Sequence, residues 1–189
     1  MNKPEEKKSY KNRIINLIIW AIVSWFLILL DQYTKYLAIT HLKGKKPWII
    51  WEGVFEFLYS ENRGAAFGIL QGKQIFFFLI GILVLAFAAY IMWHLPSWMD
   101  SHYCWLGFCV ILITAGAAGN MVDRIIQGYV VDFLYFRLIN FPIFNVADIY
   151  VTTATIALLL LMLFYYTEED LEIFRLFPRA KPDKGGNTV

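Results

Sequence analysis

Four long apolar segments are the feature that most limits what this chain can fold into. They cover residues 14–30, 75–93, 103–118 and 149–166. A helix that crosses the hydrocarbon core of a bilayer needs about 20 mostly apolar residues, within a range of about 17–25. The third segment reaches that length only when neighbouring residues are included, whereas the other three already have it. The sequence therefore predicts an all-α membrane protein with four transmembrane helices.

The composition agrees with a membrane protein and excludes two other classes. Hydrophobic residues make up 59% of the 189 positions and charged residues 17%, against about 45–50% and about 25% in soluble domains. A small soluble enzyme exposes too much of its surface to bury so many apolar side chains, and a disordered chain is far more polar. The net charge of +2 gives no reason to expect a nucleic acid partner.

The connections between the apolar segments differ in length, and they suggest a topology. The expected spans are about 14–39, 75–93, 103–119 and 148–166, with long loops at 40–74 and 120–147. Basic residues are concentrated before the first span, and the positive-inside rule assigns such a cluster to the cytoplasm. We therefore expect the tails, 1–13 and 167–189, to be cytoplasmic and both long loops to be extracytoplasmic. The aromatic and β-branched run 48–59 predicts one or two short strands at the membrane surface.

Polar residues gather where these spans meet the predicted outer surface. They are Asp31, Gln32, Lys35, Asn62, Arg63, Asn120, Asp123, Arg124, Asp132, Asn145 and Asp148. An ionisable residue at the membrane edge is costly unless it is paired, so such a residue marks a candidate functional site. A simpler interpretation stays open for Asp31 and Lys35, because residues four apart on a helix can form an ion pair that only ends the span.

Asp132 and Asp148 form the sharpest pair among these residues, because each carboxylate lies inside an apolar sequence. Two nearby carboxylates in a medium of low polarity share one proton, so that one is a base and the other an acid at the same pH. Such a pair can activate water against a peptide carbonyl without a metal or a covalent intermediate. Asp148 taken alone has a second interpretation, as the N-cap of the fourth helix.

Other hydrolytic chemistries lack their motifs. The chain has neither G-x-S-x-G nor H-E-x-x-H. His41, His94 and His102 are not spaced like a metal-binding cluster. Cys104 and Cys109 lie in an apolar span and do not form C-x-x-C. We therefore expect neither a metal nor another cofactor.

Taken together, five short motifs resemble one family, the bacterial lipoprotein signal peptidases, also called signal peptidase II. In this chain the motifs are DQYTK at 31–35, NRGAAFG at 62–68, GNMVDR at 119–124, VVDF at 130–133 and FNVAD at 144–148. Any one of them is a weak signal, but their order and spacing match those of the family, as do the four spans. The resemblance covers about residues 14–166.

The resemblance implies a fold, a reaction and a set of site residues. The implied protein is an aspartic endopeptidase of the bacterial inner membrane, which removes signal peptides from prolipoproteins before a diacylglyceryl-modified cysteine. It carries a small extracytoplasmic β-rich cradle between helices 1 and 2, and we expect it to be a monomer. The implied catalytic residues are Asp132 and Asp148. The residues expected to bind substrate or support the site are Asp31, Lys35, Asn62, Gly64, Asn120, Asp123, Arg124, Asn145 and Ala147.

The sequence departs from the family directly after Asp148. Residues 149–154 read IYVTTA, where the family usually has a small residue followed by a glycine. We expect this bulk to alter the packing near the two aspartates and to leave the chemistry unchanged.

Two other function classes use the same residues differently. A small transporter or proton-conducting protein would use the carboxylates as a relay, although it would be expected to place ionisable groups along the spans. An assembly or anchoring subunit would use the aromatic loop to bind a partner, which leaves the paired carboxylates unexplained.

Overall fold

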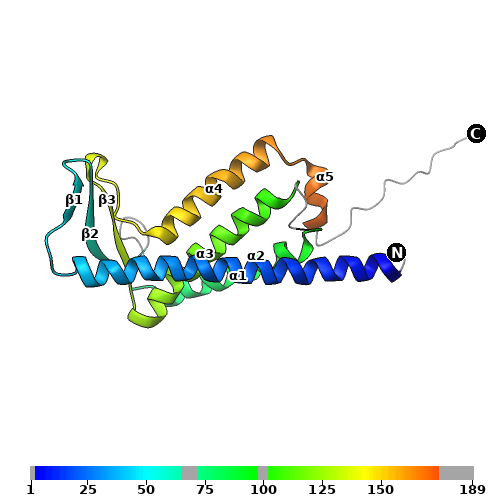
Figure 1. Cartoon of the computed structure of the whole chain (residues 1–189), viewed down its shortest axis with the longest axis horizontal. Coiled ribbons are helices and arrows are strands. Elements are labelled where there is room, and N and C mark those ends of the chain that lie inside the picture. The colour runs from blue at the N-terminus through cyan, green and yellow to red at the C-terminus, as the bar shows by residue number, and fades with distance from the viewer. Residues whose placement is uncertain (1–2, 65–71, 98–101, 175–189) are drawn as a thin grey trace, which may run out of the picture.

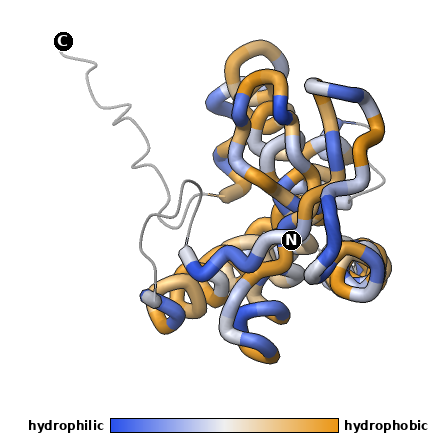
Figure 2. Tube along the Cα trace, turned by 90° about the vertical axis from the view of Figure 1, so that its left-hand side faces the viewer, coloured by the Kyte–Doolittle hydropathy of each residue, from blue (hydrophilic) through white to orange (hydrophobic). Residues whose placement is uncertain are grey.

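Four long helices form the framework of the protein. The computed structural model describes residues 3–64, 72–97 and 102–174. Its long helices are α1 Lys3–Leu42, α2 Gln74–His94, α3 Cys104–Gln127 and α4 Val146–Phe164 (Figure 1). Each of them is long and apolar enough to cross a membrane, and hydrophobic residues predominate along them (Figure 2). The prediction of four long apolar helices is confirmed.

Helix α3 packs against all three other long helices, and small residues make this possible. A Cβ atom at Gly116 would lie 2.5 Å from the carbonyl oxygen of Ala147 and 2.5 Å from a methyl group of Val151. At Gly119 it would lie 2.6 Å from Oδ2 of Asp31. Glycine at these two positions therefore lets α4 and α1 approach the α3 backbone closely, as small residues do between membrane helices.

A three-stranded antiparallel sheet lies at one end of the helices, across the end of α1 (Figure 1). Its strands are β1 Trp48–Trp51, β2 Phe55–Asn62 and β3 Val130–Phe136, in the order β1-β2-β3. The two strands between helices α1 and α2 agree with the sequence analysis.

The third strand corrects the expectation of a loop at 120–147. Helix α3 continues to Gln127 and ends at Gly128, whose φ of 77° turns the chain. Residues 130–136 then pair with β2 instead of remaining in a loop. Their β-branched and aromatic side chains suit a strand, but they become one only because β2 offers them a free edge. The sheet therefore draws on both long connections rather than on the first alone.

The alternation of side chains along β3 sets the direction of Asp132. Val131 and Phe133 are buried in a cluster with Ala38 and Leu42 of α1. Successive side chains of a strand point to opposite faces. The side chain of Asp132 therefore points away from this cluster, and it is also buried.

A short C-terminal segment packs at the opposite end of the bundle from the sheet (Figure 1). It consists of α5 Glu168–Leu171 and the 3₁₀ turn η3 Glu172–Phe174. His102 Nε2 lies 2.9 Å from Asp170 Oδ1, and the Tyr103 hydroxyl donates to the carbonyl of Asp170. The first part of the predicted polar tail is therefore attached to the helical bundle, while residues 175–189 lie outside the described residues.

Candidate active site

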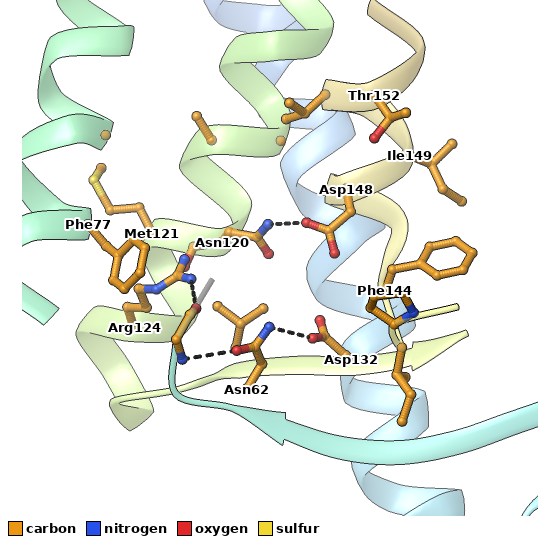
Figure 3. A pocket seen from close by; sticks show the side chains of 18 of the residues that line it. Asn62, Phe77, Asn120, Met121, Arg124, Asp132, Phe144, Asp148, Ile149 and Thr152 are labelled. Carbon is orange, nitrogen blue, oxygen red and sulfur yellow. Dashed lines mark hydrogen bonds between the residues drawn. The ribbon is translucent and has the colours of Figure 1, made fainter. Parts of the chain in front are cut away.

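A cavity of about 880 Å³ lies where the sheet meets helices α2, α3 and α4. Polar side chains from distant parts of the chain meet at its wall, among them Asn62 from β2, Asn120 and Arg124 from α3, Asp132 from β3 and Asp148 from α4 (Figure 3). The rest of its wall is mainly apolar. The structure thus brings together residues that the sequence analysis selected from four separate motifs.

Asp132 accepts two hydrogen bonds from asparagine amides. Asn145 Nδ2 donates to Oδ1 across 2.6 Å, and Asn62 Nδ2 donates to Oδ2 across 3.0 Å. The amide of Asn62 is oriented in turn by the backbone N–H of Gly64, which donates to Asn62 Oδ1. The carboxyl is only 2% exposed, so these amides replace the water that it would otherwise bind.

Asp148 lies in the first turn of α4. The N-cap of this helix is Asn145, whose side chain accepts a hydrogen bond from the backbone N–H of Asp148. Asp148 Oδ2 accepts from the backbone N–H of Asn145 in return, and Oδ1 accepts from Asn120 Nδ2 across 2.8 Å. The two residues form a capping box. Asp148 is therefore not the N-cap itself, and its second carboxylate oxygen faces the cavity residue Asn120.

Two asparagines connect the two aspartates. Asn145 Nδ2 donates both to Asp132 Oδ1 and to Asn120 Oδ1, the latter across 3.1 Å. Asn120 Nδ2 then donates to Asp148 Oδ1. A continuous series of hydrogen bonds thus leads from Asp132 through Asn145 and Asn120 to Asp148.

The surroundings of Asp132 favour its protonated form. The pKa of the Asp132 carboxyl is raised to about 7, first by burial and then by the negative charge of Asp148, against the opposing effect of the asparagine hydrogen bonds. Both causes act on the charged form, which is poorly solvated and repelled by its neighbour. Asp132 therefore keeps a proton at pH values at which an ordinary aspartate is charged.

Arg124 contributes a positive charge to the wall of the cavity. Its guanidinium donates to the carbonyl oxygens of Gly64 and Asn120, across 3.0 Å and 3.2 Å. It also lies over the ring of Phe77, with 4.5 Å between the guanidinium carbon and the ring centroid. These contacts hold the charge next to the cavity, where a polar group of a ligand can reach it. Residues 65–68 of the second motif lie outside the described residues.

Asp31, Lys35 and Asp123 form a buried ionic cluster behind the cavity. Lys35 Nζ lies 2.8 Å from Asp31 Oδ2 and 3.0 Å from Asp123 Oδ2, and it donates to Asn120 Oδ1 across 2.9 Å. All three side chains of the cluster are at most 3% exposed. Asp31 Oδ1 also accepts from the backbone N–H of Ala147. The predicted pair of Asp31 and Lys35 is thus part of a larger arrangement that reaches the site.

Comparison with known proteins identifies the family. The sequence model described as Signal peptidase (SPase) II matches residues 23–164. The lipoprotein signal peptidase of Caldanaerobacter subterraneus subsp. tengcongensis is 41% identical over 144 residues, which cover 76% of this chain and 94% of that protein. The lipoprotein signal peptidase of Streptococcus pneumoniae is 40% identical over 147 residues, covering 77% of this chain and 92% of that protein.

The chain belongs to the signal peptidase II family.

Solved structures agree with this assignment. A bacterial membrane enzyme determined by the in meso method at 2.3 Å resolution has a TM-score of 0.68 and 30% identity, and the match covers 86% of this chain and 94% of that one. A second, at 1.9 Å resolution, has a TM-score of 0.66 and 32% identity over 78% of this chain and 94% of that one. The protein is therefore a multi-pass membrane peptidase that removes signal peptides from lipoproteins, and the transporter and anchoring alternatives are not supported.

The signal peptidase II match contains every predicted site residue, but the sequence analysis overlooked several neighbours. Gln32 was noted as polar without a role, yet its Nε2 donates to Asp123 Oδ1 across 2.9 Å. Its position inside the DQYTK motif was an available signal. Phe77 also lines the cavity, but in the sequence it looks like any other residue of an apolar span.

The three histidines and the two cysteines are not among the described residues that line the cavity. His102 lies at the opposite end of the bundle, beside Asp170. In residues 3–64, 72–97 and 102–174, no three His, Cys, Asp or Glu side chains are grouped so as to hold a metal ion.

Proposed function

We propose that this signal peptidase II is an aspartic endopeptidase that cleaves before a diacylglyceryl-modified cysteine, with Asp132 and Asp148 as the catalytic residues. The observation that carries the proposal is the pair of aspartates at one cavity, Asp132 buried and Asp148 half-buried, linked by hydrogen bonds through Asn145 and Asn120. Two carboxyl groups whose surroundings give them different pKa values can act as an acid and a base at the same pH.

The surroundings of each carboxyl decide which one acts as the acid and which one as the base. Asp148 lies at the N-terminus of α4, where the helix dipole favours a negative charge, so it is the base. Asp132, with a pKa of about 7, holds the proton and is the acid. Both carboxyls sit at the wall of one cavity, which gives a substrate carbonyl and a water molecule room between them.

The reaction then needs no other reactive group. Asp148 takes a proton from water as the water oxygen bonds to the scissile carbonyl carbon, and Asp132 gives its proton to the carbonyl oxygen. When the tetrahedral intermediate collapses, the C–N bond breaks and the leaving nitrogen takes the proton from Asp148. The hydroxyl proton returns to Asp132, so the pair ends in its initial state.

The other cavity residues are assigned to substrate binding. Arg124 is suited to a backbone carbonyl of the signal peptide, because its guanidinium is held at the wall of the cavity. Asn62 and Gly64 border the same wall. Ile80 and Val84 extend the wall along the apolar helix α2, which suits the hydrophobic part of a lipidated precursor. We propose that the protein acts as a monomer.

We further propose that the sheet and the active site lie at the extracytoplasmic face of the bacterial inner membrane, with both tails in the cytoplasm. The basic residues before the first span support this orientation. All four residues of β1 are exposed and apolar, which suits a strand at the membrane surface rather than in water. The peptidase region then covers about residues 14–166, between a basic tail and a polar tail.

Substitution of each aspartate tests the proposed chemistry. We expect Asp132→Asn and Asp148→Asn to remain folded in the membrane and to lose cleavage of a diacylglyceryl-modified precursor peptide, by about 10²-fold or more. Asp170→Asn is the matched control, because Asp170 lies at the opposite end of the bundle. It should cleave at the normal rate. Normal turnover by either of the first two variants would rule out the dyad.

A further inference from the structure

The buried cluster of Asp31, Lys35 and Asp123 is connected to both aspartates through the backbone. Asp31 Oδ1 accepts the N–H of Ala147, across 2.9 Å, and Ala147 directly precedes Asp148. Asp123 Oδ2 accepts the N–H of Val131, across 3.0 Å, and Val131 directly precedes Asp132. Each carboxylate of the cluster thus holds the backbone N–H of the residue that directly precedes one aspartate of the pair.

Both of these backbone groups need a partner from outside their own element. The N–H of Ala147 belongs to the first turn of α4, where a helix offers no internal acceptor. Val131 lies on β3, an outer strand of the sheet, and its N–H bonds to α3 rather than to another strand. The ends of β3 and α4 that carry the aspartates are therefore attached to carboxylates on α1 and α3.

Lys35 joins these two attachments. Its ammonium group has three N–H donors, and it has three acceptors: Asp31, Asp123 and Asn120. The third contact fixes the amide of Asn120, whose Oδ1 is occupied by Lys35 and Asn145. Only Nδ2 of Asn120 is then left to donate to Asp148.

The cluster does not itself reach the substrate space. None of its three side chains is among the described residues that line the cavity. Replacing buried ionic groups by apolar side chains of similar size is often neutral or stabilising. Stability alone therefore does not explain the two carboxylates and the ammonium group of this cluster. A role in positioning the two aspartates explains why helices α1 and α3 carry these charges.

We propose that Asp31, Lys35 and Asp123 form an ionic clamp that fixes the separation and orientation of Asp132 and Asp148, with Lys35 as the positioning residue that bridges it. This inference rests on the proposed function, because it assumes that the two aspartates carry the chemistry. An error of about 1 Å in such a pair is enough to reduce the rate by about 10²-fold.

The clamp is tested by Lys35→Met in the full-length protein, with a synthetic precursor peptide that carries a diacylglyceryl-modified cysteine. We expect kcat to fall by about 10²-fold and KM to change little, because the cluster does not line the cavity. The matched control is Lys45→Met, which makes the same substitution at an exposed lysine. It should leave both constants unchanged.

A triple variant separates positioning from stability. Asp31→Asn, Lys35→Met and Asp123→Asn together leave no unpaired charge in the cluster. We expect this variant to recover the thermal stability that Lys35→Met loses, but not its kcat. Three results would overturn the clamp. They are recovery of kcat in the triple variant, a normal kcat in Lys35→Met, and failure of both variants to fold. The proposed function fails on a separate result, normal cleavage by Asp132→Asn.

Discussion

At the scale of single residues, the proposed mechanism requires one aspartate to act as the acid and the other as the base. Asp148 sits in the first turn of a helix and accepts a backbone N–H, whereas Asp132 sits on a strand and accepts from two asparagine side chains. The sequence analysis named both aspartates, but it did not assign one as acid and the other as base. In the proposed mechanism that difference comes from the local backbone around each residue, and in particular from the helix that begins at Val146.

The raised pKa of Asp132 predicts how activity depends on pH. Below about pH 7 Asp132 keeps its proton and can act as the acid, and above that value it loses the proton. We therefore expect kcat to fall by about tenfold for each pH unit above neutrality. Asn62→Ala removes a donor that favours the charged form, so it should shift this fall to higher pH. The measurement is a pH–rate profile of both proteins, and constant activity into the alkaline range would contradict it.

At the scale of elements, close packing of α3 against α4 sets the position of the site. Gly116 lies against Ala147 and Val151 of α4, one residue before Asp148 and three residues after it. The bulk of segment 149–154 was expected to alter packing here, and the structure shows how it is accommodated: Val151 fits over a glycine. The distance between α3 and α4 therefore depends on the absence of a side chain at Gly116.

Gly116→Ala is expected to destabilise the protein by about 1–3 kcal/mol, because the added methyl group overlaps backbone atoms that cannot move aside. Gly81→Ala on α2 is the matched control, since its methyl group would meet only the end of the Met121 side chain, 2.8 Å away, which is flexible. Thermal unfolding of both variants in detergent measures the effect. Equal stability of the two variants would contradict this account of the packing.

At the scale of the whole molecule, different structures lie at the two ends of the helical bundle. The sheet and the cavity lie at one end of the bundle, and α5 with the contact between His102 and Asp170 lies at the other (Figure 1). The family model matches residues 23–164, so α5 lies beyond the matched region. The four long helices, each long and apolar enough to cross a membrane, lie between these two ends.

The proposed orientation predicts which end is accessible from outside the cell. In a chain whose own cysteines are replaced, we introduce a single cysteine at Lys45, on the side of the sheet, or at Glu169, in α5. Both positions are exposed. A thiol reagent that cannot cross the membrane should label the first variant in intact cells and the second only after lysis. The reverse pattern would show that the orientation is inverted.

The sequence alone determined the membrane class, the four long helices and the residues of the candidate site. Hydropathy and short motifs are local properties, so they can be read along the chain without knowing what packs against what. The tertiary structure decided the rest. It pairs β3 with β2, places Asn62 against Asp132 over 70 positions of sequence, and attaches Ala147 to Asp31 over 116. Such contacts depend on a free strand edge and on a glycine at a helix crossing, and they form only when distant segments meet.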